Sequence, residues 1–167
     1  GTTAARALLE QAAHGLASEL GVGHLEYRSM APAHAGDPAY VTRDLYYTFR
    51  KRISPDNEAN MLAIPRKQRA MVRKGIKAGM KSVVEQSTRN FFALYLNNMQ
   101  RHGTPPLPQR YFDMLRQEFG RDCQVLTVMD RYGEPLSSVL SFYFRDEVLP
   151  YYARDVSVAR EMAANDF

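Results

Sequence analysis

The chain has 167 residues, 45% of them hydrophobic and 11% aromatic, which is enough apolar material for a core of ordinary size. Its apolar runs are too short to span a membrane, and its single cysteine, Cys123, excludes an intramolecular disulfide. Seven basic residues fall between Ala59 and Val84, where no Asp or Glu occurs; without them the 22 Lys and Arg become 15, against 18 acidic residues. The formal charge of +4 therefore comes from one segment, which predicts a local anion site.

The first 53 residues predict a helix followed by two strands. Leucines and alanines recur at helical spacing over residues 3–20, and Gly21 and Gly23 supply the stop. Residues 24–30 alternate in the manner of a strand, residues 31–39 are a loop rich in proline and small residues, and residues 45–49 predict a second strand.

A helical region is expected to begin at Pro55 and Asp56. Pro65 interrupts this region or restarts it, because proline is tolerated in the first turn of a helix. A helix is predicted over residues 65–78, with Gly79 as its stop, and a short strand over residues 81–86.

The helix at 65–78 carries most of the clustered positive charge. Its basic residues at helical spacing, all on one face, are Arg66, Arg69, Arg73 and Lys77. Val72 and Ile76 fall on another face and are expected to point into the core. Arginine binds phosphate through paired, charge-assisted hydrogen bonds. A solvated helix face is one alternative, and RNA binding is another, although no aromatic residues are interleaved for stacking.

The C-terminal half predicts two helices and an antiparallel meander. The helices are expected at 91–101 and 109–119, and the three strands at 124–130, 135–145 and 148–153. The apolar stripe of the first helix consists of Phe92, Tyr95, Leu96 and Met99. A last helix is expected to start near Ser157, and the chain reads as a fragment.

This order of elements, with several short motifs, resembles the FemAB-like family of the GNAT acyltransferase superfamily, and its branch near exosortase and PEP-CTERM exopolysaccharide systems. The motifs are PRKQR at 65–69, RK at 73–74, HGTP at 102–105, VLSFYFR at 139–145, LPYY at 149–152 and AANDF at 163–167. The resemblance implies an α/β, GNAT-like fold with a mixed, mostly antiparallel sheet and incomplete tandem lobes. Residues 1–53 would be the C-terminal part of the first lobe and residues 54–167 the N-terminal part of the second.

The resemblance implies an acyl- or aminoacyl-transferase that acts directly on an amine or hydroxyl of a cell-envelope glycan precursor. Acyl-CoA or aminoacyl-tRNA would be the donor, with no tightly bound cofactor, and the acceptor an anionic sugar nucleotide or lipid-linked glycan. The expected location is the cytoplasm, at the inner membrane surface. No transmembrane segment is expected, and DNA is not an expected partner. The alternative is a non-catalytic GNAT-like module that binds an anionic glycan carrier or a partner protein.

Candidate site residues follow from the same resemblance. The basic helix would hold the substrate's phosphates, while Tyr143, Tyr152 and Asp166 are candidates for proton transfer, each weighed against simple packing or surface exposure. The segment after the last strand lacks the glycines that cradle a pyrophosphate, so Arg154 and Arg160 are the candidate donor ligands. The four histidines show no ligand spacing, and no metal site is expected.

Overall fold

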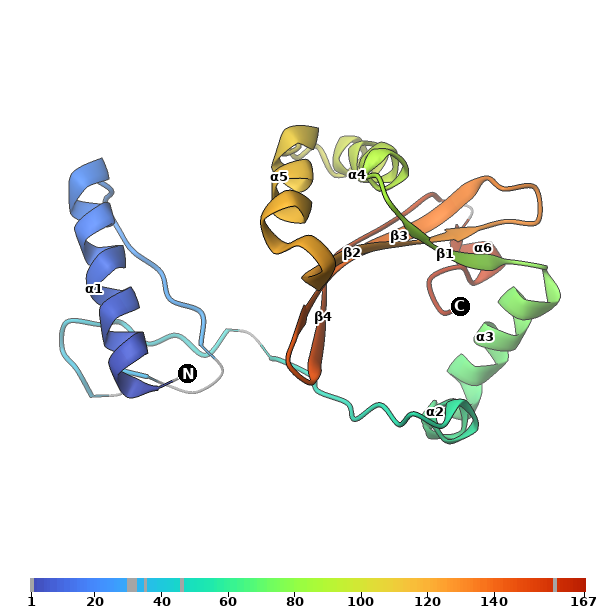
Figure 1. Ribbon diagram of the computed structural model, residues 1–167, viewed down its shortest axis with the longest axis horizontal. Helices are drawn as coiled ribbons and strands as arrows, with labels where there is room; N and C mark the ends of the chain where they lie inside the picture. The colour runs from blue at the N-terminus through green and yellow to red at the C-terminus, as the bar shows by residue number, and fades with distance from the viewer. Residues whose placement is uncertain (1, 30–32, 35, 46, 158) are drawn as a thin grey trace. The chain divides into compact units, whose positions relative to one another are not determined.

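The computed structural model describes residues 2–29, 33–34, 36–45, 47–157 and 159–167, and the side chain of Arg160 is not described (Figure 1). The chain divides into two compact units, Gly1–Arg52 and Ile53–Phe167.

The first unit contains α1 (Thr3–Leu20), which confirms the predicted helix. Thr2 caps its start by accepting a hydrogen bond from the N–H of Ala5, and Gly21 ends it in the left-handed conformation at φ 63°. The leucines of its expected apolar stripe are exposed. The predicted strands are not found: residues 24–29, 45 and 47–49 form no ladder, while residues 30 and 46 lie outside the described residues. An alternating pattern needs a hydrogen-bonded neighbour to become a strand, and these segments have none in the described part.

The second unit is built on a four-stranded sheet in the order β1-β2-β3-β4, antiparallel at every pairing. The three predicted C-terminal strands are thus confirmed as a meander. The short strand predicted at 81–86 is also confirmed, as β1, which pairs with β2 although two helices separate them in the chain. The strands are β1 (Lys81–Glu85), β2 (Cys123–Met129), β3 (Pro135–Phe144) and β4 (Glu147–Asp155).

Local signals explain most helix boundaries of this unit. Asp56 caps α2 by accepting from the N–H groups of Glu58 and Ala59, and Pro65 separates α2 from α3. Gly79, at φ 75°, ends the turn after α3. The helices are α2 (Asn57–Ala63), α3 (Arg66–Lys77), α4 (Arg89–His102), α5 (Gln109–Phe119), the 3-10 turn η1 (Gly120–Asp122) and α6 (Ala159–Met162). The fold is α/β, as predicted, and the last helix has only four residues.

The two faces of the sheet are covered differently. Helices α4 and α5 pack on one face, where the core cluster contains Phe91, Phe112, Val125 and Leu140 (Figure 1). A second cluster is formed by Met80, Val128, Leu136, Ala159 and Ala164. Because Val128 alternates with the inward Thr127 along β2, this second cluster lies on the opposite face, under the C-terminal segment.

The buried stripe of α4 is displaced from the predicted one by about one residue. Its buried residues are Phe91, Leu94, Tyr95 and Asn98, whereas three of the four predicted residues are only partly buried. The displacement brings a polar side chain, Asn98, into the interior.

Candidate functional site

Four basic residues of α3 lie where the sequence placed them, on one helix face. Arg66, Arg73 and Lys77 are exposed and Arg69 is partly buried. The opposite face is centred on Gly75, the one residue of α3 that is buried. Ile76, expected in the core, is instead 54% exposed.

A close contact explains why α3 turns this way. A Cβ on Gly75 would lie 2.9 Å from both Cβ and Cδ2 of Phe167, so only glycine lets the helix approach the C-terminal segment this closely. On the flank of the helix, Lys74 donates a hydrogen bond from Nζ to the carbonyl oxygen of Glu161. These contacts hold the inner face of α3 against residues 159–167 and leave its basic face outward.

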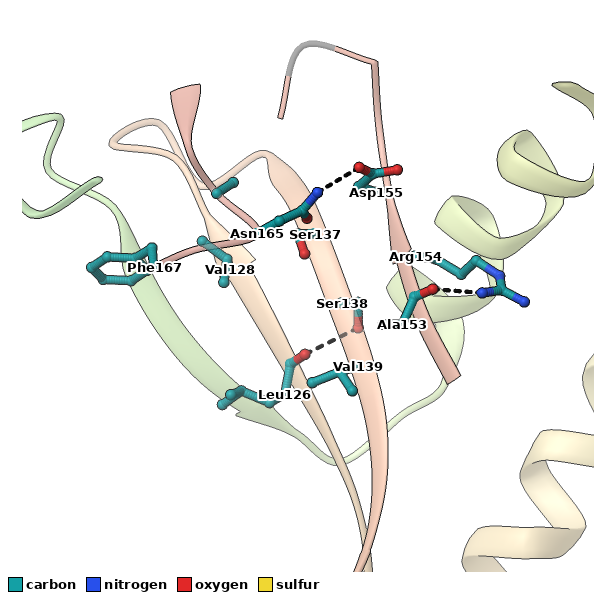
Figure 2. Close-up of a pocket in the computed structure, with 11 residues that line it drawn as sticks. Leu126, Val128, Ser137, Ser138, Val139, Ala153, Arg154, Asp155, Asn165 and Phe167 are labelled. Atoms are coloured by element: carbon teal, nitrogen blue, oxygen red, sulfur yellow. Dashed lines mark hydrogen bonds between the residues drawn. The ribbon is translucent and has the colours of Figure 1, made fainter. Parts of the chain in front are cut away.

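A hollow of about 500 Å³ lies on the sheet face opposite α4 and α5 (Figure 2). Its floor comes from β2, β3 and β4, and one end is closed by the C-terminal segment. The side chains of Leu126, Val128, Val139, Ala153 and Phe167 make it largely apolar. Polar groups gather at one end, where Figure 2 shows Ser137, Asn165 and Asp155 near one another.

Asp155, at the end of β4, is the best-connected polar residue beside this hollow. It is 7% exposed, and its Oδ1 lies 3.2 Å from the Nη2 atom of Arg101. Asn165 donates from Nδ2 to Oδ2 at 2.6 Å, and Asn98 donates to Oδ1 at 3.5 Å. A buried carboxylate is stable only with such partners, so this network ties α4, β4 and the C-terminal segment together.

Tyr152, a candidate for proton transfer, lies on the α5 side of the sheet, away from the hollow. Its ring packs edge-on against Phe112 with centroids 5.3 Å apart, and its hydroxyl lies 3.2 Å from that of Tyr111. Burial, followed by this hydrogen bond, raises the pKa of Tyr152. The phenol therefore stays protonated at neutral pH.

Strand β4 is irregular beside Tyr152. Tyr152 pairs with Leu140 and Pro150 with Ser141, so Tyr151 has no partner on β3. Tyr151 contacts Phe142 and Tyr152 contacts Phe112, which places both rings on the same side of the sheet. This bulge lies next to Pro150, which has no N–H to donate to a strand ladder.

The remaining candidates are separated from one another. Tyr143 is exposed near the far end of β3, opposite Val148. Asp166 is also exposed and lies in the turn after α6 rather than on a helix. Among the described residues, no hydrogen bond or ring contact joins any two of Tyr143, Tyr152 and Asp166.

Of the two donor-ligand candidates, Arg154 is among the residues that line the hollow, but its guanidinium points away from it. The guanidinium of Arg154 lies over the ring of Tyr95 at 5.3 Å from its centroid, on the α4 side, and Nη1 donates to the carbonyl oxygen of Ala153 (Figure 2). Arg154 alternates with Ala153 and Asp155 along β4, which explains why its side chain faces away. The side chain of Arg160 lies outside the described part of the chain.

Sequence reasoning missed Asp155, Asn98 and Arg101. The signal was present for Asn98, because it follows Phe91, Leu94 and Tyr95 at the i, i+3, i+4, i+7 spacing of a buried stripe. A polar residue at such a position needs a buried partner, and Asp155 is that partner.

A second, polar hollow of about 400 Å³ lies at the start of α4, between that helix and α5. It is lined by Gln86, Ser87, Thr88, Asp113, Arg116 and Gln117. Thr88 donates to Asp113 and accepts from Gln109, whereas the buried Nε of Arg116 has no hydrogen-bond partner among the described residues.

No protein-family model matches the chain, and no curated protein matches it either. Within the described residues, no helix combines the length and apolar character needed to cross a bilayer. Nor do the described His, Cys, Asp and Glu side chains form a group of three or more that could hold a metal ion.

Proposed function

We propose that the second unit belongs to an acyl- or aminoacyl-transferase of the FemAB-like, GNAT-related kind. The acceptor would be an amine or hydroxyl of an anionic cell-envelope glycan precursor. The element order β1, two helices, then β2, β3 and β4 supports this proposal, because it matches the order that the sequence resemblance implies. The donor would be acyl-CoA or aminoacyl-tRNA.

The observation that carries the proposal is the bulge in β4 next to the apolar hollow. A bulge leaves one residue, here Tyr151, outside the regular pairing. A backbone N–H freed in this way can hold the negative charge that develops on an acyl carbonyl oxygen during attack. The neighbouring hollow, lined by Leu126, Val139 and Ala153, fits an acyl chain.

The reaction needs no covalent enzyme intermediate. The acceptor amine attacks the acyl carbonyl, the C–N bond forms, and the bond to the thiol of acyl-CoA or to the ribose oxygen of the tRNA breaks. The proton of the amine passes to water or to Asp166, an exposed carboxylate beside Asn165 at the closed end of the hollow. Tyr152 lies on the other face of the sheet and Tyr143 near the far end of β3, so the leaving thiolate or ribose oxygen takes its proton from water.

The second candidate function is a non-catalytic module that binds an anionic glycan carrier or a partner protein. The segment after β4 favours it: residues 153–160 contain no glycine, and Asp155 in that segment is engaged by Arg101 and Asn165. A phosphate-cradling loop needs free backbone N–H groups that glycine supplies most readily.

Filling the hollow tests the transferase proposal. The full chain would be incubated with acetyl-CoA or charged tRNA and a nucleotide-linked amino sugar, and the acylated product measured by mass spectrometry. Ala153→Phe, which adds a ring inside the hollow, is expected to abolish product. Val148→Phe adds a ring to the same strand outside the hollow and is expected to retain it. Equal product from both variants would reject the site, and binding of the sugar without any product would favour the module.

A further inference from the structure

The outer side of α3 forms a positively charged surface that the transferase proposal does not use. We define the α3 basic face as Arg66, Arg69, Arg73 and Lys77, on the side of the helix opposite the buried Gly75. Within the described part of the chain, none of these four residues forms an ion pair or hydrogen bond through its side chain. Lys67 and Lys81 are also exposed nearby and add to the same local charge.

The shape of this surface argues against a site for one small ligand. Neither of the two hollows described above is lined by a residue of α3. The four cations are instead spread along a helix of 12 residues, or about 18 Å. A bound diphosphate would engage only part of that length, whereas a flat, extended array of negative charges could engage all of it.

Exposed apolar side chains accompany the charges. Ile76 is 54% exposed and follows Arg73 by three residues and Arg69 by seven, so it borders the basic face. Leu62 on α2 is 68% exposed. No Phe, Tyr or Trp occurs from residue 50 to residue 90, so the region lacks the stacking platform of a single-stranded RNA site.

We propose that the α3 basic face docks the protein peripherally on an anionic membrane surface. The guanidinium and ammonium groups would pair with lipid headgroup phosphates, and Ile76 would enter the boundary between headgroups and acyl chains. Charge complementarity carries the assignment, because seven basic residues lie in a stretch without a carboxylate while the rest of the chain has an acidic excess. This docking is independent of the acyl-transfer proposal, because that proposal rests on the hollow and does not involve α3.

Co-sedimentation of the full chain with vesicles tests the docking. The vesicles contain phosphatidylcholine alone or phosphatidylcholine with phosphatidylglycerol. Binding is expected to the second kind only, and to weaken at high salt. Replacing all four residues of the α3 basic face by Gln should weaken vesicle binding about 600-fold, since each basic residue contributes about fivefold.

The matched control removes the same four charges from exposed positions scattered over the second unit. Its substitutions are Arg89→Gln, Arg110→Gln, Arg121→Gln and Arg131→Gln. This control is expected to retain most of the binding. An equal loss in the two quadruple variants, or equal binding to both kinds of vesicle, would overturn the proposal.

Two further variants separate a membrane surface from a shaped phosphate site and guard against misfolding. Arg66→Lys/Arg69→Lys/Arg73→Lys keeps the charge and the helix, so vesicle binding should change little, whereas a paired arginine site for phosphate would be lost. Ile76→Ser should weaken vesicle binding without altering the net charge. Binding to a single-stranded RNA oligonucleotide in the absence of vesicle binding would also overturn the proposal.

Discussion

The contact between Gly75 and Phe167 predicts how a single methyl group changes the stability of the second unit. A Cβ at residue 75 would lie 2.9 Å from two carbons of the Phe167 side chain. Overpacking of this kind costs about 1–3 kcal/mol, whereas alanine stabilises a helix interior by about 1 kcal/mol relative to glycine. Gly75→Ala is therefore expected to lower the free energy of unfolding by about 0–2 kcal/mol.

Phe167→Gly removes both contacting carbons, the Cβ as well as the ring, and should reverse the sign. In that background Gly75→Ala is expected to stabilise the protein by about 1 kcal/mol, which gives a coupling of about 1–3 kcal/mol in a double-mutant cycle. Urea unfolding of the four proteins measures this coupling. Ala70→Gly, at an exposed position of the same helix, measures the difference in helix propensity between alanine and glycine without the close contact. An equal change in the free energy of unfolding from Gly75→Ala in the wild-type and Phe167→Gly backgrounds would refute the close contact.

Two further predictions concern the polar network and the buried tyrosine. Asp155→Ala should lower the free energy of unfolding by about 2 kcal/mol, because Asn165 and the partly exposed Arg101 lose the carboxylate that accepts their hydrogen bonds. A change below about 0.5 kcal/mol in urea unfolding would contradict the network. Burial and the hydrogen bond with Tyr111 raise the pKa of Tyr152, so the folded state favours the protonated phenol. This stabilisation of the folded state is complete below about pH 10 and is lost as the pH rises through the folded pKa. Tyr152→Phe should make the fall in unfolding midpoint above about pH 10 shallower, and an unchanged fall would show that Tyr152 titrates normally.

Periodicity and end signals in the sequence predicted most elements of the second unit and the first helix. The limits of α1 and α5 are those predicted, because glycine at or just after a helix end and helical spacing of leucine or aromatic residues act locally. The meander was also predictable, since its strands are joined by short turns and pair with their sequence neighbours. The strands expected at 24–30 and 45–49 were wrong over their described residues, because alternation alone does not supply a partner strand.

The sequence also determined that charge would gather on one face of α3, because helical spacing places Arg66, Arg69, Arg73 and Lys77 together wherever the helix lies. Which face of α3 would be buried was decided only by tertiary contact. Gly75 has no side chain to bury, so hydrophobicity pointed to Ile76, whereas the Phe167 ring needed the space that only a glycine leaves. The pairing of Asn98 with Asp155 depends in the same way on chain segments 57 residues apart meeting at the end of β4. Spacing along the chain cannot encode such a meeting, because it depends on how separate elements pack.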